Sequence, residues 1–125
     1  MTAYGQSKTA AVLLAAGVTA RWADDGIVSN ALNPGAIATG LQKHTGGLRT
    51  PAEFQKTVAG GCDLCAAGSV LVDGIGGRYF EDCNESPLVA ERPTDFSGGV
   101  APYALDPDNA ARLWDIGAAL AGLTG

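Results

Sequence analysis

The apolar positions follow a helical spacing at both ends of the chain. Residues 3–24 are rich in Ala and Leu and contain no Pro, and Leu14, Val18 and Trp22 recur every four residues as one apolar stripe. Gly26 stands where a left-handed residue commonly ends a helix. The pattern therefore predicts a helix over residues 3–24.

A second helical pattern closes the chain. Asp106-Pro107 is a typical helix start, because Pro is favoured at the first helical position. The apolar residues that follow share one face of the predicted helix: Leu113, Ile116, Leu120 and Leu123.

Two short segments have the character of strands. Residues 27–33 contain β-branched side chains and stop at Pro34-Gly35, a tight-turn pair. Residues 78–80 follow a Gly-rich turn at 73–77 and combine Arg, Tyr and Phe. Both segments are predicted to be strands.

The middle of the chain is less regular. Residues 36–49 contain Thr39, Gly40, Gly46 and Gly47 and have little periodicity, so we expect a loop. Thr50 and Pro51 form a helix-start signature, which predicts a helix to about Val72, weakened by its glycines. Residues 81–103 are expected to be irregular surface chain.

The resulting order is helix, strand, loop, helix, strand, tail, helix, an alternation that indicates an α/β fold with a parallel sheet. We treat residues 1–125 as a single partial domain, with residues 1–80 forming its α/β part and residues 81–125 a tail and helix. Two strands do not make a stable parallel sheet, because such sheets are buried on both faces. We therefore expect part of the fold to be absent.

The composition limits the classes of function that are expected. Only 8 of the 125 residues are Lys or Arg and the net charge is -5, so the basic face that nucleic acid requires is not expected. The longest apolar run, residues 10–18, is much shorter than the ~20 residues of a membrane span. With three Cys and no secretion signal, the chain is expected in the cytoplasm.

Tyr4 and Lys8 form the first candidate site. Residues four apart on a helix share one face, so the phenol and the ammonium can interact. At an effective dielectric constant of ~20, a unit positive charge ~6 Å away stabilises a phenolate by roughly 3 kcal/mol. Such a pair suits a general acid/base, although a Tyr and a Lys also meet at this spacing by chance.

The sequence around this pair resembles the short-chain dehydrogenase/reductase family. Residues 3–10 (AYGQSKTA) are similar to its Tyr-x-x-x-Lys helix, and residues 26–39 (GIVSNALNPGAIAT) to the strand and Pro-Gly turn that follow. Residues 77–85 (GRYFEDCNE) and the closing helix resemble the branch of retinol dehydrogenases and protochlorophyllide reductases. The likeness covers nearly the whole chain and implies the carboxy-terminal half of a Rossmann-like doubly wound sheet, with two strands and about three helices.

The resemblance implies an oxidoreductase that transfers a hydride between NAD or NADP and a small carbonyl or alcohol substrate. Tyr4 would exchange the proton of the substrate oxygen, and Lys8 would favour its phenolate form and hold the nicotinamide ribose. The residues implied in cofactor binding are Tyr4, Lys8, Pro34, Gly35, Ile37 and Thr39.

The family's phosphate-binding loop and active-site Ser have no counterpart in these residues. Residues 74–77 precede a strand, so they are expected to form a plain turn and not a phosphate loop. We therefore expect a truncated chain, with the amino-terminal half absent, that is inactive alone.

Two alternatives remain. The chain could be a non-catalytic interaction module, forming a homo-oligomer or binding an intact relative through the Tyr-bearing helix and an exposed strand edge. Cys62 and Cys65 could serve a redox or zinc site, but Cys83 and His44 are distant in sequence, so buried small residues and no metal are expected.

Overall fold

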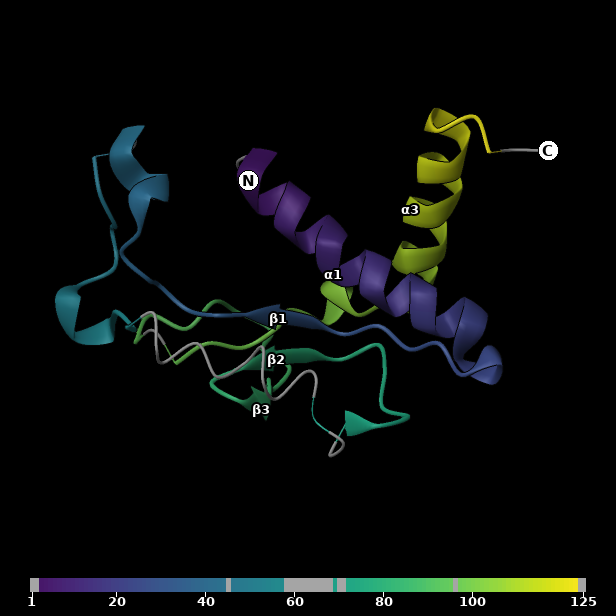
Figure 1. Cartoon of the computed structure of the whole chain (residues 1–125), viewed down its shortest axis with the longest axis horizontal. Coiled ribbons are helices and arrows are strands. Elements are labelled where there is room, and N and C mark those ends of the chain that lie inside the picture. Colours follow the sequence, from purple (N-terminus) through teal and green to yellow (C-terminus); the bar gives the residue numbers. More distant parts are fainter. Residues whose placement is uncertain (1–2, 45, 58–68, 70–71, 96, 124–125) are drawn as a thin grey trace.

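The computed structural model describes residues 3–44, 46–57, 69, 72–95 and 97–123. Two long helices lie on one side of a small sheet, and a looped arm extends beyond the carboxyl end of the first strand (Figure 1). The architecture is α/β, as the alternation of elements predicted.

Helix α1 spans Ala3–Trp22 and continues as a short 3-10 helix at Ala23–Asp25. Gly26 then takes the left-handed conformation, with φ of 78°, and its N–H donates to the Ala23 carbonyl. A residue with a side chain would be strained in this conformation, so Gly26 is the reason that the helix ends here. The predicted first helix and its cap are confirmed.

The sheet has three strands in the order β1-β2-β3. β1 (Ala31–Asn33) pairs in parallel with β2 (Tyr79–Glu81), with Leu32 opposite Phe80. β3 (Asn84–Glu85) pairs antiparallel to β2. Both predicted strands are present, although β1 is shorter than the segment 27–33, and β3 was not predicted.

The turn between β2 and β3 explains why the third strand was missed. Asp82 and Cys83 both have positive φ, 52° and 61°, which is the conformation of a tight two-residue hairpin turn. Asn-Gly and Asp-Gly are the usual signals of that turn, and Asp82-Cys83 carries no Gly.

Thr19 joins α1 to the segment that leads into β1 through two hydrogen bonds. Its hydroxyl donates to the carbonyl of Ser29 at 2.9 Å and accepts from the N–H of the same residue at 2.9 Å. A Cβ at Gly76 would lie only 2.7 Å from the Thr19 side chain and 2.6 Å from Val28. The Gly-rich turn before β2 is therefore a close packing site, and the prediction of a turn at residues 73–77 is confirmed.

Helix α3 spans Pro107–Leu120 and packs against α1. The Asp106 carboxylate caps it by accepting from the Asn109 N–H at 2.8 Å, as the Asp-Pro start predicted. Ala110 is buried in this contact, whereas Ile116 and Leu120 are exposed. The small and aromatic positions of α3 thus face α1, and the predicted apolar face lies largely in solvent.

The core is small and includes residues from both 1–80 and 81–125. Phe80 on β2 is 7% exposed, and its burial stabilises the fold by about 2 kcal/mol. The other buried apolar residues are Ala15, Val100, Ala104 and Ala110. Because Val100 belongs to the segment expected to be irregular surface chain, that segment instead contributes to the core.

Two predictions for the middle of the chain are corrected by the described residues. Instead of a long helix from Thr50, the chain forms a 3-10 helix at Ala52–Phe54, after which Gln55 is extended and Lys56 bridges to Ile37 in parallel. The remainder of the predicted helix, residues 58–68 and 70–71, lies outside the described residues. Residues 81–103 also contain regular structure, because Leu88 bridges to Val100 and Pro102–Ala104 forms a 3-10 helix.

Candidate functional site

Tyr4 and Lys8 lie side by side on the first turns of α1. The Lys8 ammonium is 5.1 Å from the centroid of the Tyr4 ring, within the range of a cation–π contact. The Tyr4 side chain is 70% exposed and is therefore open to a reactant. The prediction that helical spacing places these two side chains on one face is confirmed; their catalytic role stays a prediction.

The turn after β1 is built around Asn33. Its side-chain oxygen accepts from the Gly35 N–H at 3.0 Å, and its side-chain nitrogen donates to Glu81 on β2 at 3.0 Å. Gly35 has φ of 89°, where a side chain would be strained and would also collide with Lys56. The Pro34-Gly35 pair therefore turns the chain sharply out of the sheet, as predicted.

Ile37 and Thr39 follow on the arm that this turn directs away from the sheet. The Thr39 N–H donates to the side-chain oxygen of Gln42 at 2.9 Å, and the Thr39 hydroxyl donates to the same oxygen at 3.3 Å. The Gln42 side-chain nitrogen donates in turn to the Ile37 carbonyl at 3.3 Å. We call Ile37 O, Thr39 N and Thr39 Oγ1 the carboxamide cradle.

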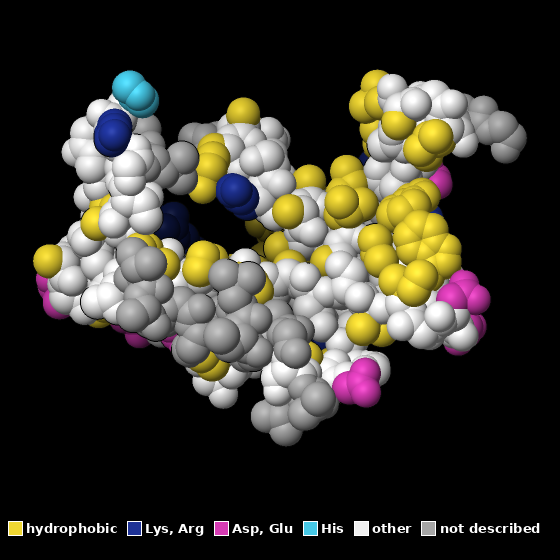
Figure 2. Space-filling view, viewed as in Figure 1, with side chains coloured by type: hydrophobic (Ala, Val, Ile, Leu, Met, Phe, Trp, Pro, Cys, Tyr) yellow, Lys and Arg dark blue, Asp and Glu magenta, His cyan; other side chains and the backbone are white. Residues whose placement is uncertain are grey.

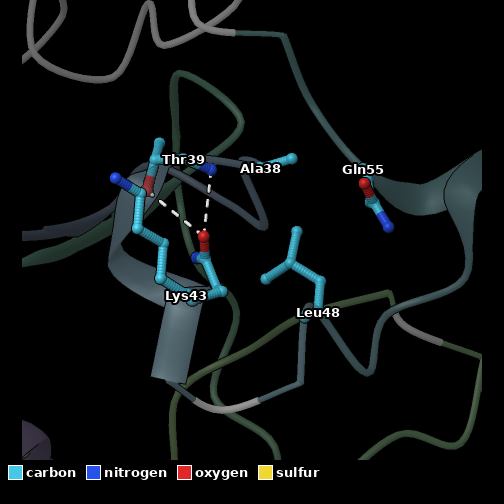
Figure 3. Close-up of a pocket in the computed structure, with 7 residues that line it drawn as sticks. Ala38, Thr39, Lys43, Leu48 and Gln55 are labelled. Atoms are coloured by element: carbon cyan, nitrogen blue, oxygen red, sulfur yellow. Dashed lines mark hydrogen bonds between the residues drawn. The ribbon is translucent and has the colours of Figure 1, made fainter.

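The carboxamide cradle borders a cavity of about 290 Å³ (Figure 3). Its wall is partly apolar, from Ala38 and Leu48, and partly polar, from Lys43 and Gln55. Sequence analysis singled out Ile37 and Thr39 here but missed Gln42. The signal would have been a Gln three residues after a Thr, a spacing at which a side chain can reach back to the backbone.

The two groups of predicted site residues lie on segments that border a common hollow, the amino end of α1 and the arm. α1 and β1 run in opposite directions, so the amino end of α1 lies above the carboxyl end of β1 (Figure 1). Figure 2 shows the surface hollowed between this end of α1 and the arm that carries residues 40–44. A reactant in that hollow would have the amino end of α1 on one side and the arm on the other (Figure 2).

Glu81 is a polar centre that sequence analysis did not identify. One of its carboxylate oxygens accepts from the Asn33 side chain and the Tyr79 hydroxyl, at 3.0 and 3.3 Å. The other accepts from the Ser86 hydroxyl at 2.9 Å and the Gly99 N–H at 2.7 Å. Because it joins β1, β2 and the following segment, Glu81 holds the turn after β1 in place.

A larger cavity of about 650 Å³ adjoins Glu81. Asn33, Gly35 and Ala36 contribute to its wall, together with the ion-paired Lys56 and Asp82. The turn after β1 therefore has a cavity on this side as well as the one beside the carboxamide cradle.

The remaining candidates do not form a site among the described residues. No cluster of His, Cys, Asp or Glu able to hold a metal occurs in that part of the chain, and His44 is exposed. Cys62 and Cys65 lie outside the described residues, and Cys83 is disulfide-bonded, a pairing that was not predicted.

Within the described part of the chain, none of the helices has the length and apolar character needed to cross a membrane.

Comparison with known proteins identifies relatives along nearly the whole chain. It is 44% identical to a probable oxidoreductase of Streptomyces lividans over 93% of its length. It is 38% identical to the short-chain dehydrogenase/reductase prx1 of Penicillium rubens over 91%, and 31% identical to human retinol dehydrogenase 14 over 96%. No model of a protein family and no solved structure matches the chain.

The chain spans less than half the length of these relatives: 43% of the Streptomyces protein, 36% of the Penicillium protein and 35% of the human protein. The relatives are named as oxidoreductases and dehydrogenases, in agreement with the Tyr4–Lys8 pair and the parallel pairing of β1 with β2. The chain therefore belongs to the short-chain dehydrogenase/reductase family, and it corresponds to the carboxy-terminal part of that fold.

Proposed function

We propose that this chain supplies the catalytic pair and the nicotinamide side of an NAD(P)-dependent oxidoreductase that interconverts a carbonyl and an alcohol. The observation that carries the proposal is the Lys8 ammonium 5.1 Å from the ring of an exposed Tyr4, at the end of α1 that faces the turn after β1. A cation beside a phenol favours the phenolate, which a general acid/base needs in order to exchange a proton near neutral pH.

The carboxamide cradle supports the nicotinamide assignment. It already holds one primary carboxamide, that of Gln42, through two donors to its oxygen and one acceptor from its nitrogen. The nicotinamide ring carries the same chemical group, so this set of atoms fits it. Pro34 and Gly35 form the turn that leads from β1 into the arm, and Ile37 and Thr39 lie on that arm.

The chemistry divides between the cofactor and the protein. When bound, the nicotinamide supplies or accepts the hydride at the substrate carbon. In the reducing direction the Tyr4 hydroxyl gives its proton to the substrate oxygen, so the carbonyl becomes an alcohol; in the oxidising direction the phenolate takes that proton back. Lys8 stabilises the phenolate in both directions and would also contact the nicotinamide ribose.

These 125 residues contain no counterpart of the family's phosphate loop or active-site Ser, so we expect little activity from them alone. The test therefore uses a chimera in which this chain replaces the matching segment of the Streptomyces lividans relative. NADH and NADPH oxidation are measured with a panel of small aldehydes and ketones. The substrate, the choice between NAD and NADP and the cytoplasmic location all stay predictions.

Tyr4→Phe is the decisive variant. General acid/base groups contribute about 10²- to 10⁴-fold, so the turnover of the chimera should fall by that factor while its melting temperature is unchanged. Tyr103→Phe is the matched control, because Tyr103 is 49% exposed on a 3-10 helix and has no proposed role in the reaction. Full turnover in the Tyr4→Phe chimera would refute the proposal.

A second candidate function is association with another copy or an intact relative. Leu14 is 49% exposed on α1, Ile116 and Leu120 are 56% and 85% exposed on α3, and in the described sheet β1 pairs only with β2. Such apolar surface and an open strand edge favour protein contacts. Co-expression with the intact relative, followed by size-exclusion chromatography, would detect this; a lone monomer that melts cooperatively would argue against it.

A further inference from the structure

The carboxamide of Gln42 makes three hydrogen bonds to the carboxamide cradle. Its oxygen accepts from the N–H and the hydroxyl of Thr39, and its nitrogen donates to the Ile37 carbonyl. Figure 3 shows the two bonds from Thr39 converging on one oxygen at the wall of the cavity. A second primary carboxamide cannot use the same atoms while Gln42 is in place.

We propose that Gln42 is an internal competitor of the cofactor: its side chain occupies the carboxamide cradle and has to rotate away before a nicotinamide carboxamide can bind. This inference rests on the proposed function, since it takes the carboxamide cradle to be the nicotinamide site. It assigns to Gln42 a positioning and regulatory role in cofactor affinity.

Displacement is feasible because the contact is local. Gln42 is three residues from Thr39 and half-buried, and it reaches the carboxamide cradle only through the rotatable bonds of its own side chain. Hydrogen bonds of this kind exchange readily with solvent or ligand, so their net strength is small. The proposal requires only that this side chain rotates, with the backbone of the arm left in place.

The need to displace Gln42 should lower the apparent affinity for a nicotinamide ligand. When only a fraction of the molecules is competent to bind, the apparent affinity falls by that fraction. Removing the competing carboxamide should therefore tighten the binding of a nicotinamide ligand, by roughly fivefold for a side chain that occupies the carboxamide cradle about four-fifths of the time.

A carboxylate analogue separates this competition from a general opening of the cavity. Nicotinic acid mononucleotide differs from nicotinamide mononucleotide only in having a carboxylate where the latter has a carboxamide. The carboxylate has no N–H to donate to the Ile37 carbonyl, so it matches the carboxamide cradle poorly. The amide ligand should therefore gain more than the acid from the removal of Gln42.

The experiment titrates the full 125-residue chain with each mononucleotide and follows the backbone amide of Thr39 by NMR. The variants are the unaltered chain, Gln42→Ala and Gln42→Asn, whose side chain is one methylene shorter. Gln55→Ala is the matched control, because Gln55 lines the same cavity but donates to the Thr50 carbonyl. Circular dichroism checks that every variant keeps its helices.

We expect Gln42→Ala to bind nicotinamide mononucleotide roughly fivefold more tightly than the unaltered chain, with a smaller gain for the acid and no change in Gln55→Ala. In the unaltered chain, the amide ligand should also shift the side-chain NH₂ signals of Gln42. Equal or weaker binding by Gln42→Ala, with Thr39 still shifting, would overturn the competition alone. If no variant responds at Thr39 to either ligand, the nicotinamide site itself is wrong, and the inference is overturned with it.

Discussion

The two ends of α1 use the same interaction for different purposes. At the carboxyl end, the Arg21 guanidinium lies 4.3 Å from the centroid of the Trp114 ring, and Trp22 meets that ring edge-on at 5.3 Å. At the amino end, the Lys8 ammonium lies 5.1 Å from the Tyr4 ring. Each end pairs a cation with an aromatic ring, yet only the first pair joins two elements of the fold.

This difference decides what each end can contribute. Trp114 belongs to α3, so its contacts with Arg21 and Trp22 resist separation of the helices and stabilise the folded chain. Tyr4 and Lys8 are one turn apart on the same helix and both exposed, so their contact adds little to stability. The amino end is therefore free to be used for chemistry, and the carboxyl end is not.

The largest expected effect is on the turnover of the chimera, and it concerns the amino end of α1. Lys8→Met in the chimera removes the cation beside Tyr4 and should lower turnover by about 10- to 100-fold, because the ammonium favours negative charge on the Tyr4 oxygen while the proton is transferred. The melting temperature should not change. Initial rates with NADH or NADPH, together with thermal melts, measure both quantities.

Arg112→Met is the control for this prediction, since it removes a cation from the exposed surface of α3. Its rate should match that of the unaltered chimera. Equal losses in the two variants would mean that overall charge, and not the Tyr4–Lys8 pair, governs the rate.

The next effect is on stability and concerns the carboxyl end. Trp114→Ala removes the ring that Arg21 and Trp22 contact, and should lower the free energy of unfolding by about 2 kcal/mol, less than for a fully buried Trp because Trp114 is half-buried. Urea denaturation followed by circular dichroism measures the change.

Ile116→Ala on the same helix is the control, because Ile116 is 56% exposed, and it should cost under about 0.5 kcal/mol. If the two substitutions were equally costly, the contact between α1 and α3 would not depend on the Trp114 ring.

The smallest effect tests how closely α3 approaches α1. A Cβ at Gly17 would meet Trp114 at 3.6 Å and the Ala110 carbonyl at 3.7 Å, which are ordinary contact distances. Gly17→Ala should therefore stabilise the chain by about 0.5–1 kcal/mol through helix propensity. Gly117→Ala on α3, where a Cβ meets nothing within 4 Å, gives the propensity gain alone. Destabilisation by Gly17→Ala only would show that the helices need a glycine at their contact.

Local signals predicted much of the fold. The helical spacing of residues 3–24, Gly26 and the Asp106-Pro107 start each act within a few residues, and the helices begin and end where these signals place them. The long helix from Thr50 was wrong, because the chain at Gln55 and Lys56 is extended and bridges to Ile37 instead. A pairing partner nearly twenty residues away overrode a local helix start.

The sequence by itself determined that Tyr4 and Lys8 share a helix face, that Pro34-Gly35 ends the first strand, and which family the chain resembles, because spacing and turn residues act locally. Only the tertiary structure decided that Glu81 holds the turn after β1, that Trp114 meets Arg21 and Trp22, and that Val100 and Ala104 are in the core. These contacts join residues far apart in the chain, and their geometry follows from how the helices and strands pack together.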